Sequence, residues 1–138
     1  MRPYALLLAG LVAAGSVEAQ TDLQRLQGDW TMVSATLDGT AYPGASGTRH
    51  VSGDTTTVTV NGQLLMRARF ILRPATNPKA IDYQILEGAT AGSNHLGIYQ
   101  VGDSTLTFCL ASPGAARPTE FASTAGDGRT CSEWKRKP

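Results

Sequence analysis

The residues best suited to metal chemistry in this 138-residue sequence are two histidines and two cysteines. His50 and His95 lie far apart, each in or beside the end of an expected strand. The cysteines, Cys109 and Cys131, lack Cys-x-x-Cys spacing and have no histidine close by in the sequence. Zinc sites use three or four such ligands, often in closely spaced pairs. The sequence therefore predicts no metal site, and it contains no cofactor-binding motif.

Two carboxylates, Asp82 and Glu120, would suit general acid and base chemistry if their strands faced each other. Alternation, however, places Asp82 on the polar face of its strand, away from Ile81 and Tyr83, where Arg117 is a suitable partner. A structural ion pair explains these residues better than catalysis does. The nucleophile elbow, the phosphate loop, the zinc-protease motif and the dinucleotide fingerprint are absent. We therefore expect no catalytic residues and no enzyme.

Residues 1–19 have the pattern of a cleaved secretory signal peptide. Met1–Tyr4 is basic, residues 5–15 are apolar and rich in Leu and Ala, and Val17 and Ala19 stand where a signal peptidase reads. The apolar run is too short to cross a bilayer of about 30 Å. We expect an exported protein, periplasmic or extracellular and not embedded in a membrane, with one domain at residues 20–138.

The expected export affects both the net charge of the mature chain and the expected state of the cysteines. Removing residues 1–19 removes Arg2 and Glu18, which leaves 11 basic and 10 acidic residues. A domain this close to neutral is not expected to bind nucleic acid, which requires a strongly basic surface. An oxidising compartment predicts a disulfide between Cys109 and Cys131. The alternative is two separate thiols, one of them a small buried apolar residue.

Short β-branched or alternating segments separated by Gly, Asp, Asn and Pro are typical of an antiparallel all-β domain. In the most regular segment, Leu64, Met66, Ala68, Phe70 and Leu72 share one face, and Arg67 and Arg69 lie on the other. We expect strands at residues 30–37, 48–52, 55–60, 64–72, 80–86, 96–101, 105–111, 117–123 and 130–135, after a short helical turn. This pattern predicts a small up-and-down barrel of about eight strands, and an open sandwich is the alternative.

Gly28-Asp29-Trp30 opens the first expected strand, and Trp134-Lys135-Arg136-Lys137 ends the last. An indole can plug one end of a barrel while a cation lies across its face. We expect Trp30 to be buried beneath Arg136, because a planar guanidinium stacks on indole better than an ammonium does. This pairing favours the barrel over the sandwich.

An eight-stranded barrel encloses either a packed core or a hollow for one small ligand. Candidate lining residues are Trp30, Met66, Phe70, Tyr83, Ile85, Phe108 and Leu110. The first functional hypothesis is a module that binds a small apolar or amphipathic molecule. The second is a packed barrel that contacts another protein, for instance around Tyr42 and Pro43. We expect a monomer in either case, and the sequence identifies neither the ligand nor a protein partner.

Five blocks of sequence together resemble one family: residues 26–30, 77–82, 96–99, 106–110 and 117–121. In this order they are similar to a lipocalin-like domain best known from secreted proteins of planctomycetes and other bacteria, over nearly all of the chain after residue 19. The resemblance implies a lipocalin-like barrel and export. It also implies Cys109, whereas Cys131 is not expected throughout the family. Because the family brings no established activity, it implies no catalytic residue.

Overall fold

A helix precedes the sheet in the computed structural model, which describes residues 16–42 and 46–138. This helix, α2, spans Val17–Leu26, and the side chain of Ser16 caps it by accepting a 2.9 Å hydrogen bond from the amide of Ala19. Glu18 in the first turn and Arg25 in the last both complement the helix dipole. The sequence predicted only a short helical turn, because the first turn of α2 coincides with the end of the expected signal peptide.

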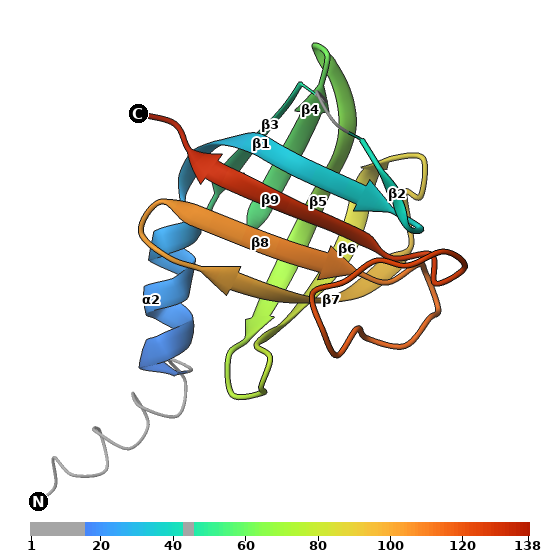
Figure 1. Ribbon diagram of the computed structural model, residues 1–138. Helices are drawn as coiled ribbons and strands as arrows, with labels where there is room; N and C mark the ends of the chain where they lie inside the picture. The colour runs from blue at the N-terminus through green and yellow to red at the C-terminus, as the bar shows by residue number, and fades with distance from the viewer. Residues whose placement is uncertain (1–15, 43–45) are drawn as a thin grey trace, which may run out of the picture.

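The strands form a closed antiparallel barrel (Figure 1). Neighbours pair in the order β2-β1-β3-β4-β5-β6-β7-β8-β9, and β1 also pairs with β9. Eight strands therefore close the barrel, while the two-residue β2 pairs only with the end of β1. The predicted all-β barrel is confirmed, and the sandwich is excluded. The strands of the described residues are β1 (Gly28–Leu37), β2 (Thr40–Ala41), β3 (Gly47–Ser52), β4 (Thr55–Val60), β5 (Gln63–Arg73), β6 (Ala80–Gly88), β7 (Asn94–Val101), β8 (Thr105–Leu110) and β9 (Thr130–Arg136).

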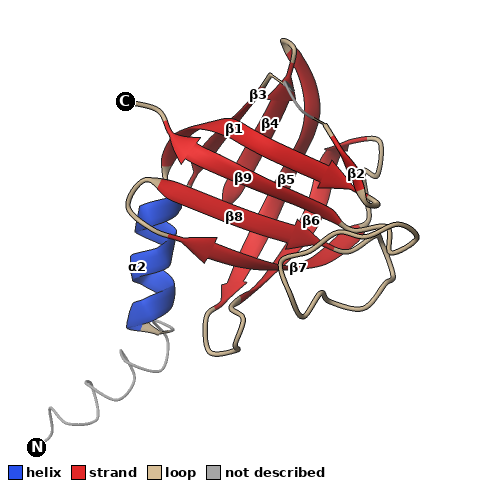
Figure 2. Ribbon diagram, viewed as in Figure 1, coloured by secondary structure: helices blue, strands red, loops and turns tan. Residues whose placement is uncertain are grey.

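One expected strand, at residues 117–123, is not formed. These residues belong to the long connection between β8 and β9, which Figure 2 draws as loop. Pro118 is buried there and has no amide hydrogen to donate to a ladder. Arg117 instead uses its side chain, donating to the carbonyls of Ile81 and Gly97 at 3.1 and 2.9 Å. The segment is held against β6 and β7 without joining the sheet.

The turn between β4 and β5 follows the predicted chemistry. Asn61 and Gly62 both have positive φ, 52° and 79°, as a tight hairpin of the primed type requires. A register shift follows, so that Val58 pairs with Met66 while Thr59 pairs with Leu64. This bulge removes Leu64 from the alternation, and it is exposed rather than on the inner face with Ala68.

The core lies inside the barrel. It consists of inward-facing side chains from the barrel strands together with Leu26 of α2, and it includes Trp30, Val51, Phe70, Tyr83, Tyr99, Phe108 and Trp134. Among the described residues, no helix is long and apolar enough to cross a bilayer.

Candidate functional site

The candidate site is the barrel interior, and one of its ends is sealed. Trp30 is 0% exposed, and its Nε1 donates a 2.9 Å hydrogen bond to the carbonyl of Leu26 at the end of α2. The guanidinium carbon of Arg136 lies 4.2 Å from the centre of the Trp30 ring. Arg136 also donates hydrogen bonds to the carbonyls of Asp103, Gln27 and Arg25. The last strand thus clamps the helix over the indole, and we call this end of the barrel the floor.

Gly28 is needed where the chain enters the floor. Its φ is +108°, a conformation that side chains rarely adopt. A Cβ atom at this position would lie 3.4 Å from Nη1 of Arg136. The predicted grouping of Gly28, Trp30 and Arg136 is therefore present as one contact set.

A buried carboxylate holds α2 against the floor. Asp22 of the helix is 1% exposed, and its Oδ2 accepts from the hydroxyl of Tyr99 at 2.7 Å and from Nζ of Lys79 at 2.9 Å. Lys79 also lies 3.0 Å from Glu18. The hydrogen bond to Asp22 raises the pKa of Lys79, and burial raises the pKa of Tyr99. The lysine thus stays charged and the tyrosine neutral near pH 7, and both hold the carboxylate in place.

An arginine that sequence reasoning did not single out lies in the middle of the interior. Arg49 is 4% exposed and extends inward from β3. Its guanidinium carbon lies 4.5 Å from the ring centre of Phe108 and 4.4 Å from that of Trp134. Nη1 donates to the hydroxyls of Thr56 at 2.8 Å and Tyr83 at 3.0 Å. Two aromatic rings and two hydroxyls therefore surround a positive charge.

This charge has no counter-ion among the residues the structure describes. The described ion pairs that involve arginine are formed by other arginines, and Nε of Arg49 has no hydrogen-bond partner there. Burial lowers the pKa of Arg49, but an arginine remains protonated near neutral pH. Burial likewise raises the pKa of Tyr83, so its hydroxyl is a neutral partner. Within the described part of the chain, the barrel interior thus carries one unneutralised positive charge.

The end opposite the floor, which we call the mouth, is lined by apolar side chains that are partly exposed. Val60 and Leu110 end β4 and β8, and Met32 and Met66 lie further along β1 and β5. All four pack against the core and are only partly buried. Glycine makes room for one of them, since a Cβ on Gly47 would lie 2.9 Å from Cε of Met32. Methionine side chains are flexible and adapt to irregular shapes. The two ends of the interior therefore differ, one sealed and one lined by partly exposed side chains.

The seven predicted lining residues divide between these regions. Trp30 belongs to the floor, while Phe70, Tyr83, Ile85 and Phe108 are buried in the core cluster. Met66 and Leu110 lie at the mouth. All seven belong to, or pack against, one cluster, and these side chains fill the interior at their positions.

The predicted acid–base candidates lie on the outer surface. Oδ1 of Asp82 forms a 2.7 Å ion pair with Nη2 of Arg117, although this contact does not have hydrogen-bond geometry. Oδ2 of Asp82 accepts a 2.7 Å hydrogen bond from Nε of Arg73. Burial alone would raise the pKa of Asp82, but these two arginines outweigh it and hold the pKa below its usual value. Glu120 is exposed and takes no part in this cluster. Asp82 and Arg117 are thus together in a structural network.

The cysteines form the predicted disulfide. Cys109 and Cys131 are paired residues on β8 and β9, with an S–S distance of 2.03 Å. His50 lies beside Asp29 at 2.8 Å, and His95 contacts the carbonyl of Ala111 and the hydroxyl of Thr90. Within residues 16–42 and 46–138 no cluster of three or more metal-ligating side chains occurs.

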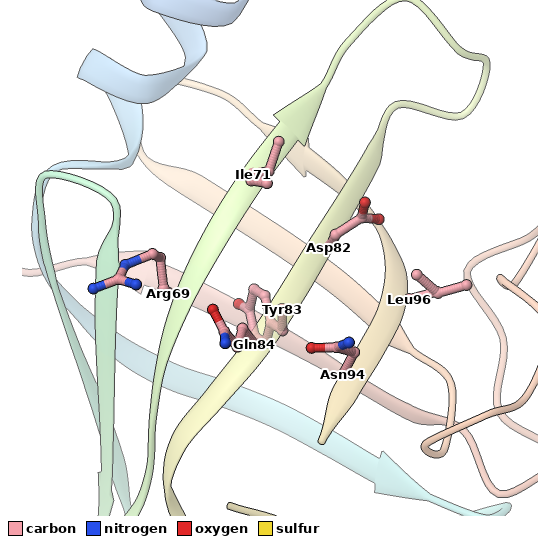
Figure 3. A pocket seen from close by; sticks show the side chains of 7 residues that line it. All are labelled: Arg69, Ile71, Asp82, Tyr83, Gln84, Asn94 and Leu96. Atoms are coloured by element: carbon pink, nitrogen blue, oxygen red, sulfur yellow. The ribbon is translucent and has the colours of Figure 1, made fainter. Parts of the chain in front are cut away.

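Two hollows of about 340 Å³ each lie on the outer face of the barrel rather than inside it. Figure 3 shows the first, which crosses β5, β6 and β7 between Arg69, Asp82 and Asn94. The second lies over β1, β8 and β9, between the disulfide and the loop residues 121–123. Most of the side chains around both are small or polar, and neither hollow contains a buried unpaired charge comparable to Arg49.

Comparison of the chain with protein-family models, curated proteins and solved structures found no match. The eight-stranded antiparallel barrel is compatible with the lipocalin-like resemblance, and membership of that family stays a prediction.

Proposed function

We propose that this protein is an exported, non-catalytic binding module that holds one small amphipathic molecule inside its barrel. The observation that carries the proposal is the difference between the two ends. The floor is sealed by Trp30, Arg136 and α2, whereas the mouth exposes flexible apolar side chains such as Met32 and Met66. A ligand would enter through the mouth and displace these methionines, which can repack without breaking a strand.

Export and a lipocalin-like origin are part of the same proposal. A disulfide between Cys109 and Cys131 supports an oxidising compartment, since such bonds persist mainly outside the cytoplasm. The barrel and the sequence blocks together support a lipocalin-like origin. The helix α2 runs across the expected cleavage point after Ala19, so a mature protein that begins at Gln20 would lose the contact between Glu18 and Lys79. It would keep Asp22, which has the shorter contact with that lysine.

A second candidate is a protein-interaction module with a solid barrel. Two observations favour it. Inward-facing side chains fill the core. Leu37, Leu64 and Leu65 are exposed near the mouth ends of β1 and β5, and Tyr42 is exposed just after β2. Pro43, which the sequence placed beside Tyr42 in this role, lies outside the described residues. A solid barrel would bind partners through these rim residues and would take up no small molecule.

Native mass spectrometry of the protein exported by its own host separates the two candidates. The intact mass should correspond to residues 20–138 with one disulfide, and a second population should carry an additional noncovalent mass of a few hundred daltons. Organic extraction should release this mass. A chain recovered without any bound molecule, and which takes up none of a panel of amphiphiles, would favour the solid barrel. A chain that retains Met1 outside the cytoplasm would contradict the predicted signal peptide.

A further inference from the structure

The buried guanidinium of Arg49 indicates the chemical class of the ligand. An unpaired charge in a protein interior is strongly destabilising unless other groups compensate it. Two stacked rings and two neutral hydroxyls compensate it only in part, because neutral groups stabilise a buried charge less than a counter-ion does. A hydrophobic residue of similar length would fill the same space without this cost. The position is thus better suited to recognition than to packing.

The hydrogen-bonding edge of the guanidinium narrows the choice of ligand. Both of its hydrogen bonds leave from Nη1, so the edge formed by Nε and Nη2 makes none to the described residues. This side-on edge presents two parallel N–H groups, the arrangement that binds both oxygens of a carboxylate. Arg49 is the one cation among the buried residues that the structure describes, and a single positive charge matches a singly charged head group. The stacked rings of Phe108 and Trp134 hold the guanidinium plane and reduce the freedom it would lose on binding.

We infer that the interior binds an amphiphile with a carboxylate head, the carboxylate paired with Arg49 and the apolar tail directed to the mouth. This inference rests on the proposed function and specifies its ligand. The tail would contact Met32, Val60, Met66 and Leu110, which are the partly buried apolar side chains at that end. The ion pair would neutralise the one buried charge that lacks a counter-ion among the described residues.

Three ligands of equal chain length test the inference: octanoate, 1-octanol and octylammonium. Binding is measured by titration calorimetry and by tryptophan fluorescence, because Trp134 contacts the guanidinium that would bind the head group. We expect octanoate to bind at least about tenfold more tightly than 1-octanol, since charge-assisted hydrogen bonds are roughly twice as strong as neutral ones. Octylammonium should bind weakest, because its charge has the same sign as that of Arg49.

Two arginine variants test whether Arg49 causes the preference for octanoate over 1-octanol. Arg49→Met should remove the preference for octanoate and keep or improve binding of 1-octanol. Arg69→Met is the matched control, since this arginine is exposed on the outer face of the same barrel and pairs loosely with Asp54 at 3.8 Å. The control should retain the full preference. A control that loses it, or an Arg49→Met variant that keeps it, would overturn the inference.

The carboxyl of ¹³C-labelled octanoate gives a measurement that needs no variant, so the test holds even if Arg49→Met fails to fold. Bound to the wild-type protein, the carboxyl should titrate at lower pH than in free octanoate, because the guanidinium favours the ionised form. A carboxyl that titrates at or above the free value overturns the inference. If 1-octanol binds as well as octanoate, the proposed function stands and the carboxylate inference fails. If none of the three ligands binds, both fail.

Discussion

The contact between Arg136 and the floor is the most direct place to test why this barrel closes. We predict that Arg136→Ala lowers the free energy of unfolding by about 3 kcal/mol, more than a stacking contact alone would suggest. Arg136 stacks on Trp30, and it also donates to three backbone carbonyls, those of Gln27 at 2.8 Å, Asp103 at 2.9 Å and Arg25. Two of these carbonyls belong to the end of α2 and the residue after it, so one side chain joins the last strand to the helix.

The magnitude follows from these contacts. A partly exposed cation–π contact contributes about 1 kcal/mol. A typical intramolecular hydrogen bond contributes a net of about 1 kcal/mol, and three of them would give about 3. The sum of about 4 kcal/mol is an upper value, because Arg136 is only partly buried and water can reach the freed carbonyls. Arg136→Lys should lose about 2 kcal/mol, since an ammonium keeps the charge but cannot reach three carbonyls in one plane.

Urea denaturation of the oxidised protein, followed by tryptophan fluorescence, measures these differences. Lys135→Ala is the matched control, since Lys135 is the exposed neighbour on the opposite face of β9 and should change the free energy of unfolding by less than about 0.5 kcal/mol. If Arg136→Ala costs no more than this control, the clamp contributes nothing to closure. If Arg136→Lys is as stable as the wild type, charge rather than the three-carbonyl geometry explains the contact.

Two other predictions concern the sulfurs and the outer ion pairs. Replacing both Cys109 and Cys131 by serine should lower the free energy of unfolding by about 3 kcal/mol in the chain-entropy model, measured by the same denaturation; an unchanged midpoint would show that the bond adds no stability. The stabilising contribution of Asp82 should be complete above its unfolded pKa of about 3.9 and be lost as pH falls through its lower folded pKa. Asp82→Asn should therefore flatten the loss of stability below about pH 4, while Asp103→Asn, at an exposed residue, should not; equal acid profiles for the wild type and Asp82→Asn would contradict the pairing.

The sequence predicts the barrel because several independent signals agree. Period-two alternation, turn residues such as Asn61-Gly62 and the Trp30–Arg136 pair all indicate the same closed sheet, and the structure has each of them. The helix is underestimated because its first turn coincides with the end of the expected signal peptide. The bulge that moves Leu64 outward depends on the register of β4 against β5, which no single-strand pattern contains.

Arg49, the interior arginine, shows a different limit of prediction from the sequence alone. In β3, burial alternates strictly, and Gly47, Arg49 and Val51 are the buried set. The position of Val51 alone would have placed Arg49 on the inner face, so the signal was present in the sequence. The general tendency of arginine to lie at the surface outweighs that signal when a sequence is considered by itself. Only the packing of Phe108 and Trp134 around the guanidinium, contributed by distant strands, shows why the charge is tolerated.

The pairing of β1 with β9 also constrains when this chain can fold. The first strand, β1, can pair with β9 only after β9, the last strand, has been synthesised. Arg136, which clamps the floor, also belongs to β9. Until then, β1 and β8 each have an edge without its final partner. Contacts so distant in sequence form slowly, because a long loop must close before they contribute. The barrel of a growing chain therefore cannot close until β9 has been synthesised, and until then the edge of β1 that pairs with β9 stays open to other strands.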